Sequence, residues 1–205
     1  KPAIKISRLP DAIHATPGAL DAASLEKLAE AVKTSPSLPL VLDLRRIASF
    51  DFEAAFTWAD AFMKDGEMGR VKTTAKESAR FAAPDVSVAP PKVLILMDGS
   101  TAGAAEILAA ALHKALGAPL GGEPTFGLGR SQETVPLASG AALLLSTREY
   151  MLPGGEALEG KGLQPDYAAK DNPDTPEDEL LDTLERSKWL ENKSAEAAAK
   201  PPANN

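Results

Sequence analysis

The chain has 205 residues, which is enough for one α/β domain with a full core, and nothing in this length demands a second domain. Its formal net charge of −7 disfavours binding to a phosphate backbone, so we expect no nucleic-acid partner. The sequence has no cysteine, which excludes a disulfide framework, and no run of eighteen apolar residues, so we expect no membrane span.

The first half of the chain alternates between apolar patterns typical of strands and of helices. Phe52, Phe56, Ala59 and Met63 recur at helical spacing, which predicts an amphipathic helix. The expected elements are, in order, a strand at 4–6, a loop at 11–18, a helix at 24–34 capped by Ser24, a buried strand at 38–44, a helix at 52–63 and, within a polar irregular segment at 66–85, a short strand at 70–73.

The second half continues this alternation and then loses its apolar residues. The most apolar strand candidate, at 93–97, is followed by a tight turn and an alanine-rich helix. The expected elements are the strand at 93–97, a helix at 102–116, a short strand at 118–121, a hairpin pairing 133–135 with 141–145, a continuation of that strand at 147–152 and a helix at 176–189.

Repeated alternation of strand and helix predicts an α/β fold. We expect a core domain at residues 1–170 and a C-terminal helix at 171–190. Residues 191–205 contain alanine, lysine and proline but no large apolar side chain to bury, so they are predicted to be a disordered tail.

Several segments follow one another in an order that is typical of one enzyme family. They read V-L-D-L-R at 41–45, V-L-I-L-M-D-G-S-T-A-G-A-A-E-I-L at 93–108, G-E-P-T-F-G-L-G-R-S-Q at 122–132, Y-M-L-P-G-G at 150–155 and G-K-G-L-Q-P-D at 160–166. Together they resemble the catalytic core of the carboxyl-terminal processing peptidases, also called tail-specific proteases. The resemblance implies a core like that of the crotonase and ClpP proteins, with a mixed sheet and packed helices.

The chain departs from this family at the positions that carry the chemistry. By the resemblance, the nucleophilic serine falls at Gly103 and the general-base lysine at Leu128, so the Ser-Lys dyad is absent. Residues 46–51 replace the asparagine, proline and glycines whose backbone N–H groups help to form the oxyanion hole. Gln132, which matches a glutamine that assists the lysine in some members, is retained together with Glu106.

Ser100 is the fallback nucleophile, although we expect it to cap the helix that follows. A base for it is hard to find in the sequence. His113 lies ten residues along that helix from Gly103, a rise of about 15 Å. Lys92 opens the preceding strand, on the order of 20 Å away. Lys161, in a loop, is the one lysine that these considerations do not exclude.

Three hypotheses follow. The first is a catalytically inactive homologue of a processing peptidase, retained for polypeptide binding or assembly. The second is an active serine endopeptidase that uses Ser100 to process protein C-termini, and the third is a structural subunit whose old cleft is filled by Phe50, Leu128 and their neighbours. The candidate binding residues are Ser100, Gly103, Ala104, Leu128 and Gln132.

The resemblance also implies partners and a location. We expect a polypeptide ligand, with a protein C-terminus as one form of it. No metal or other cofactor is expected, because two separated histidines and scattered carboxylates show no ligand spacing. Family members usually carry a PDZ domain upstream, and no PDZ-like segment occurs in these 205 residues. A homo-oligomer and a periplasmic or cell-envelope location are further expectations.

Overall fold

Short apolar strands form the centre of the protein. The structure is a computed structural model that describes residues 3–169, so the predicted C-terminal helix at 171–190 and the tail at 191–205 lie outside the described residues. Strands β3 (Leu40–Asp43) and β7 (Val93–Met97) are buried along their whole length, as their unbroken apolar sequences predict.

Six strands form a mixed sheet in the order β1-β2-β3-β7-β9-β12. β1 and β2 pair antiparallel, and all other neighbours in this sheet pair parallel. Successive side chains of β7 point to opposite faces, so Ile95 joins the main core whereas Leu94 joins a smaller apolar cluster. The bounds of the other four strands are β1 (Lys5–Arg8), β2 (Ile13–Thr16), β9 (Leu120–Gly122) and β12 (Tyr167–Ala168).

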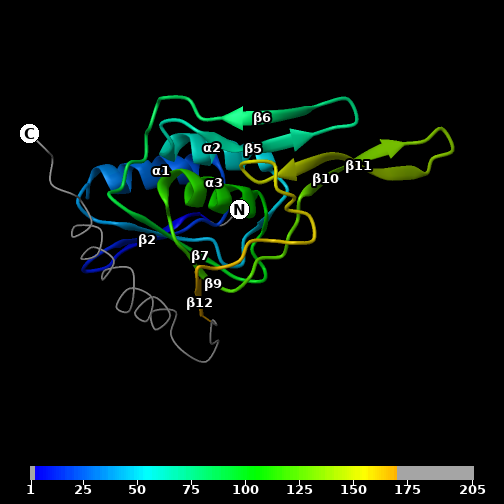
Figure 1. Ribbon diagram of the computed structural model, residues 1–205. Helices are drawn as coiled ribbons and strands as arrows, with labels where there is room; N and C mark the ends of the chain where they lie inside the picture. The colour runs from blue at the N-terminus through cyan, green and yellow to red at the C-terminus, as the bar shows by residue number, and fades with distance from the viewer. Residues whose placement is uncertain (1–2, 170–205) are drawn as a thin grey trace, which may run out of the picture.

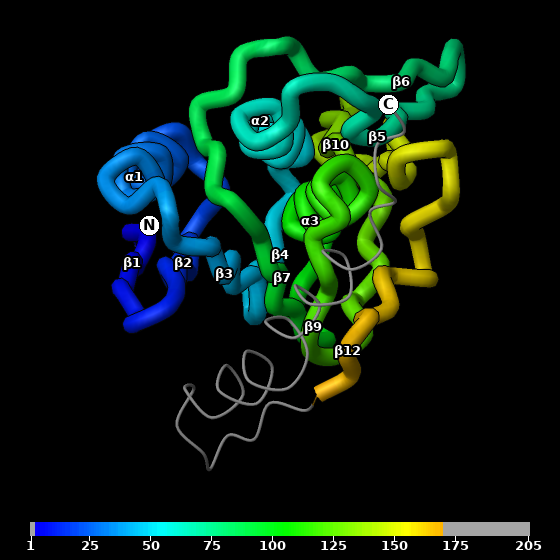
Figure 2. Tube along the Cα trace, turned by 60° about the vertical axis from the view of Figure 1, so that its left-hand side comes forward, coloured from blue at the N-terminus to red at the C-terminus, as the bar shows by residue number. Residues whose placement is uncertain are grey.

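Three helices cover one face of this sheet, with α1 towards the β1 end and α3 towards β7 and β9 (Figure 2). Their bounds are α1 (Ala22–Lys33), α2 (Phe52–Phe62) and α3 (Ala104–Leu116). Nine of the thirteen residues of α3 are buried, which accounts for its alanine-rich sequence. None of the helices within residues 3–169 is long and apolar enough to cross a membrane.

A second, antiparallel sheet lies on the other side of the helices, in the order β10-β11-β5-β6. Both α2 and α3 contact β5, so these helices lie between the two sheets. The strands are β5 (Glu67–Lys72), β6 (Glu77–Phe81), β10 (Arg130–Pro136) and β11 (Ala142–Met151). The hairpin of β10 and β11 projects away from the rest of the molecule (Figure 1). The predicted α/β fold with a mixed sheet and packed helices is therefore confirmed.

Three local predictions were wrong. The predicted loop at 11–18 contains β2, which pairs parallel with β3. Ser24 is not the N-cap of α1, because the carboxylate of Asp21 accepts a hydrogen bond from Ser24 N at 2.8 Å and the N-cap therefore lies three residues earlier in the chain than predicted. The polar segment at 66–85 is more regular than its composition indicates, since it forms the β5–β6 hairpin.

Candidate functional site

The turn between β7 and α3 places Gly103 in a conformation that few other residues adopt. The predicted helix at 102–116 begins only at Ala104, because Ala102–Gly103 form the short strand β8. Gly103 has φ 68° and ψ −117°. A sharp, strained turn from strand to helix is how hydrolases expose a nucleophilic side chain, and glycine adopts it without the strain that a side chain would cause. The backbone of the turn has the conformation that such a nucleophile requires, but Gly103 has no side chain that could act as one.

Hydrogen bonds within the turn, and from the turn to the segment after β3, hold the turn in place. Asp98 Oδ1 accepts from Arg46 N at 3.0 Å and from Ser100 N at 3.0 Å. The hydroxyl of Thr101 accepts from Asp98 N and lies 3.0 Å from the carbonyl oxygen of Leu44. Ser100 itself is exposed and is not the N-cap of α3, because that position belongs to Gly103. The expected capping role of Ser100 is therefore wrong.

Glu106 is the group that joins this turn to the loop carrying Leu128. Its side chain is fully buried and accepts hydrogen bonds from Gly103 N at 2.8 Å and from Leu128 N at 2.9 Å. The second carboxylate oxygen accepts from Gly127 N at 2.7 Å and from the hydroxyl of Thr125. Four donors therefore satisfy one buried carboxylate, and the retention of Glu106 has a structural reason that is independent of catalysis.

These bonds bring positions 103 and 128 together. A Cβ atom built on Gly103 would lie 3.5 Å from Cδ2 of Leu128, which is half-buried. This is the proximity that a nucleophile and its base require. The two side chains present, a hydrogen atom and an isobutyl group, supply neither a hydroxyl nor an amine.

The segment that replaces the oxyanion loop lies against Gly103 instead of opening a space beside it. Strand β4 (Ala48–Ser49) pairs parallel with β8, and Ala102 N donates to Ile47 O at 2.9 Å. The carbonyl oxygen of Ser49 overlaps the place of a Cβ on Gly103, and the carbonyl carbon of Ser49 would lie 3.2 Å from it. Phe50 is 66% exposed, so the backbone of β4, and not Phe50, occupies the old nucleophile position. The proposed filling role of Phe50 is therefore wrong.

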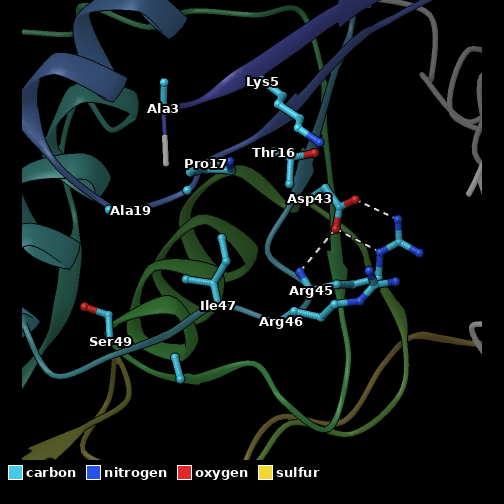
Figure 3. A pocket seen from close by; sticks show the side chains of 12 residues that line it. Ala3, Lys5, Thr16, Pro17, Ala19, Asp43, Arg45, Arg46, Ile47 and Ser49 are labelled. Atoms are coloured by element: carbon cyan, nitrogen blue, oxygen red, sulfur yellow. Dashed lines mark hydrogen bonds and ion pairs between the residues drawn. The ribbon is translucent and has the colours of Figure 1, made fainter. Parts of the chain in front are cut away.

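An open pocket of about 550 Å³ lies on the other side of β4, where β2 and β3 end (Figure 3). Its wall contains the buried ion pair of Asp43 and Arg45, with Arg45 Nη2 2.7 Å from Asp43 Oδ2. His14 Nε2 lies 3.2 Å from the same carboxylate oxygen. Burial alone would raise the pKa of Asp43, but the hydrogen bonds from Arg45 and His14 outweigh it and lower the pKa to about 2. The charge of Asp43 is therefore matched inside the protein.

Two more cations line this pocket. Lys5 lines it from β1, close to Thr16 (Figure 3), and Arg46 lines it beside Arg45. Arg46 has φ 62° and is the one non-glycine residue with positive φ among residues 3–169. Such backbone strain persists only where surrounding contacts hold it, and the bond from Arg46 N to Asp98 is one of them.

The other residues predicted to belong to the site lie apart from this centre or serve the fold. Gln132 is exposed on β10, just after a register shift in its pairing with β11. Ala104 is fully buried in the first turn of α3. The ring of His113 lies 2.9 Å from the carbonyl oxygen of Ala118, so it links the end of α3 to the segment that leads into β9. Lys161 is exposed, although its backbone packs against Gly127.

Sequence reasoning missed two residues that shape the site. Ser49 belongs to a two-residue strand, which is too short for any apolar pattern to mark. Thr125 joins two loops, because its hydroxyl donates to Glu106 and accepts from Leu163 N at 2.7 Å. Thr125 could have been found from the sequence by its place in the G-E-P-T-F-G segment.

Comparison with known proteins gives the same family throughout. Residues 6–169 match the model of peptidase family S41. The chain is 31% identical over 151 residues to a carboxy-terminal-processing protease of Bartonella bacilliformis, covering 72% of this chain and 35% of that protein. It is 35% identical over 133 residues to the carboxy-terminal processing protease CtpA of Bacillus subtilis, covering 63% and 28%. The chain thus spans about a third of the length of these relatives.

Solved structures show the same fold. The photosystem II D1 C-terminal processing protease superposes with a TM-score of 0.70 at 23% identity, covering 77% of this chain and 42% of that chain. A putative peptidase from Parabacteroides merdae superposes with a TM-score of 0.71 at 15% identity, covering 98% and 67%. At these identities the likeness concerns the fold alone, whereas the family match rests on the sequence. This chain belongs to peptidase family S41, the family of the carboxy-terminal processing proteases.

Proposed function

We propose that this chain is a catalytically inactive member of its peptidase family, retained to bind polypeptide. One observation carries the proposal: the backbone of Ser49 occupies the place where the side chain of a nucleophile at position 103 would begin. A Ser-Lys mechanism needs a hydroxyl within hydrogen-bond reach of an amine, and Gly103 and Leu128 provide neither.

The exposed hydroxyl of Ser100 does not compensate for this loss. Its backbone N–H is bonded to Asp98, which fixes the turn with Ser100 at the surface. A serine becomes a nucleophile only beside a base, and among residues 3–169 no lysine or histidine has a hydrogen bond with the Ser100 hydroxyl. The active-peptidase alternative therefore lacks the contact it needs most.

The pocket beside β4 is where we propose that the polypeptide binds. A volume of about 550 Å³ is within the usual range for ligand sites. Lys5, Arg45 and Arg46 contribute three positive charges to its lining and Asp43 one negative charge, so its formal charge is positive in a chain of net charge −7. This sign favours a carboxylate, and a polypeptide C-terminus is the carboxylate that the family resemblance suggests. We further propose that binding takes place in the periplasm or cell envelope.

Inactivity is tested by covalent labelling and by turnover. The chain is incubated with a fluorophosphonate probe and, separately, with casein, and each experiment is repeated with Ser100→Ala. We expect no labelled side chain and no cleavage in either protein. Turnover that disappears in Ser100→Ala would contradict the proposal and establish the active alternative.

Binding is tested by calorimetric titration with peptides that end in a free carboxylate and with the same peptides amidated. We expect heat with the free carboxylates, weaker binding of the amides, and weaker binding of both by Lys5→Gln. Lys76→Gln is the matched control, because Lys76 is an exposed lysine at the turn between β5 and β6. If no peptide gives heat, the chain is a structural subunit and the binding proposal fails.

A further inference from the structure

The net negative charge of this chain comes from one short segment. Residues 171–185, called the acidic segment below, follow the last described residue, Ala169, after a single lysine. All charged side chains of the acidic segment are carboxylates: Asp171, Asp174, Glu177, Asp178, Glu179, Asp182 and Glu185. The rest of the chain contains 22 acidic and 22 basic residues, so the acidic segment accounts for the whole net charge of −7. Such a segment is attracted to a positively charged surface within its reach.

The parallel strands bring the start of the acidic segment to the edge of the six-stranded sheet where the pocket beside β4 lies. Asp43 of β3 pairs with Leu96 of β7. Leu96 pairs in turn with Gly121 of β9, and Gly121 pairs with Tyr167 of β12. Because these four strands are parallel, β3 and β12 end at the same edge of the sheet (Figure 2). The chain therefore leaves β12 beside the edge that contains the pocket.

The acidic segment is long enough to cross the remaining distance. Neighbouring strands lie about 4.8 Å apart, so the three steps from β3 to β12 span about 14 Å. Five extended residues cover about 17 Å, so Asp174 is within reach of the pocket from Ala169. The residues from 175 to 185 add further carboxylates to the same tether.

The pocket has the opposite charge. Lys5, Arg45 and Arg46 line it, and Asp43 is the one carboxylate among its lining residues (Figure 3). Arg45 is buried against Asp43, whereas Lys5 and Arg46 are exposed. Two of the three cations are thus accessible to a segment that approaches from solvent.

A second hollow lined by basic residues is a poorer match. It has a volume of about 280 Å³ and lies on the other sheet, between the β5–β6 turn and β11. Its cations Lys72 and Arg148 lie 4.0 Å from Glu149 and 3.7 Å from Glu133, respectively. Arg130, its third cation, stands opposite Glu149 in the pairing of β10 with β11. Neighbouring carboxylates therefore offset the charge of this hollow, and the pocket beside β4 is the better partner.

We propose that the acidic segment docks in the pocket beside β4 of its own chain and competes there with the carboxylate of a polypeptide. The docking requires only charge and reach, whereas the competition rests on the proposed function. A tethered segment needs little intrinsic affinity, because a short tether gives an effective concentration on the order of 1 mM. An intrinsic Kd of about 0.1 mM then keeps the pocket roughly nine-tenths occupied and weakens a competing peptide about tenfold.

The first test detects docking in the unmodified chain and needs no peptide. A carbodiimide joins an amine to a carboxylate in contact with it, and mass spectrometry of the digested protein identifies the linked residues. At low ionic strength and low protein concentration, we expect Lys5 to become linked to a carboxylate of the acidic segment. Lys76 is the matched control, because it is an exposed lysine at the turn between β5 and β6, and it should not form this link.

Three results of this test would overturn the docking. The first is a link from Lys5 that is no more frequent than the link from Lys76. The second is a link found only between two chains, in a product of twice the mass. The third is a yield that high salt leaves unchanged, because a contact between exposed charges is screened by salt.

The second test measures competition by calorimetric titration with a peptide that ends in a free carboxylate. Two variants of equal net charge are compared, one neutralised in the acidic segment and one at exposed carboxylates outside the pocket lining. The substitutions are Asp174→Asn, Glu177→Gln and Asp178→Asn in the segment variant, and Asp11→Asn, Asp65→Asn and Asp85→Asn in the control. We expect the segment variant to bind the peptide between about twofold and tenfold more tightly than the unmodified chain, and the control to bind it as the unmodified chain does.

The outcomes distinguish a failure of this inference from a failure of the proposed function. Equal peptide affinity in all three proteins would overturn the competition and leave the proposed function standing. If none of the three proteins gives heat, the proposed function fails and the competition fails with it, whereas the carbodiimide links still decide whether the acidic segment docks.

Discussion

The turn into α3 and the outer half of the β10–β11 hairpin, residues 134–145 and called the arm below, differ in what they bury and what they expose. At the turn, the charged side chain of Glu106 is fully buried, and its bonds join the start of α3 to the loop that carries Leu128. In the arm, Leu144 is 61% exposed although it is among the most apolar residues of the chain. Loss of any hydrogen-bond donor to the buried carboxylate of Glu106 would lower the stability of the fold, whereas the leucines of the arm are unfavourable only while they face water. Contacts within the fold therefore fix the shape of the turn, whereas they leave the leucines of the arm exposed.

If the chain is inactive as proposed, this difference explains how the site could lose its chemistry and keep the geometry of the turn. The bonds that set the turn come from Asp98, Thr101 and Glu106, none of which stands at the nucleophile or base position. Replacing the reacting groups by Gly103 and Leu128 leaves all of these bonds in place. The positions remain adjacent because the scaffold, and not the dyad, holds them together.

The largest expected effect comes from removing the centre of this scaffold. Glu106→Ala leaves three backbone N–H groups and one hydroxyl without their buried acceptor, so we expect it to lower the free energy of unfolding by about 3–5 kcal/mol. Urea unfolding followed by circular dichroism measures the loss. A loss below about 1 kcal/mol would mean that water replaces the carboxylate, and the turn would not be held as described.

The next effect tests whether the old nucleophile position is closed. Gly103→Ser adds a side chain at φ 68°, where its Cβ overlaps the backbone of Ser49, so we expect a loss of about 2–4 kcal/mol. The double variant Gly103→Ser with Leu128→Lys restores both reacting groups, and we expect it to remain unlabelled by a fluorophosphonate probe.

Labelling at residue 103 in the double variant, absent from the single variant Leu128→Lys, would contradict this expectation. It would mean that β4 moves aside readily and that the loss of two side chains alone accounts for inactivity. Comparing the two variants therefore distinguishes a site that lacks only the hydroxyl and the amine from a site that also lacks room for a side chain at position 103.

Much of this architecture follows from the sequence, and the exceptions have physical causes. The apolar runs at β3 and β7 predict buried strands because no other environment suits them. The family segments predict that Gly103 and Leu128 meet. Strands β4 and β8 could not be predicted, because two residues have no periodicity and their pairing depends on the approach of a distant loop.

The pocket beside β4 also could not be predicted from the sequence. Asp43 and Arg45 are two residues apart in the chain, so their ion pair is a local contact. His14, by contrast, reaches Asp43 only because β2 pairs with β3 in parallel, and that pairing was missed when residues 11–18 were predicted to be a loop. Tertiary pairing, and not local propensity, created this cluster.

The buried carboxylate of Asp43 gives a smaller effect that depends on pH. Its pKa is about 2 in the folded protein, below the value of about 3.9 in an unfolded chain. Between these values the unfolded state binds more protons, so stability present above pH 4 is lost as the pH falls towards 2. The difference corresponds to about 2–3 kcal/mol. We expect urea unfolding of Asp43→Asn to show lower stability at pH 7 and a loss between pH 5 and 2 that is smaller by this amount.

An unchanged pH slope in Asp43→Asn would assign that acid sensitivity to other carboxylates. Glu67 is one of these, because its hydrogen bond with Arg70 lowers its pKa. It lies on β5, far along the chain from the pocket, and it is unaffected by the substitution. The variant therefore distinguishes the buried cluster from the ion pairs at the surface.

The smallest expected change in the free energy of unfolding is that of a substitution in the arm. Leu143→Glu replaces an exposed side chain, 45% accessible, so in the monomer it should change the free energy of unfolding by less than about 0.5 kcal/mol. Urea unfolding at low protein concentration measures this value, with Phe81→Glu, at another exposed apolar residue, as the control. A loss of about 2 kcal/mol or more would mean that Leu143 is packed against its own chain. The arm would then contribute to the stability of the fold, and its contrast with the turn would fail.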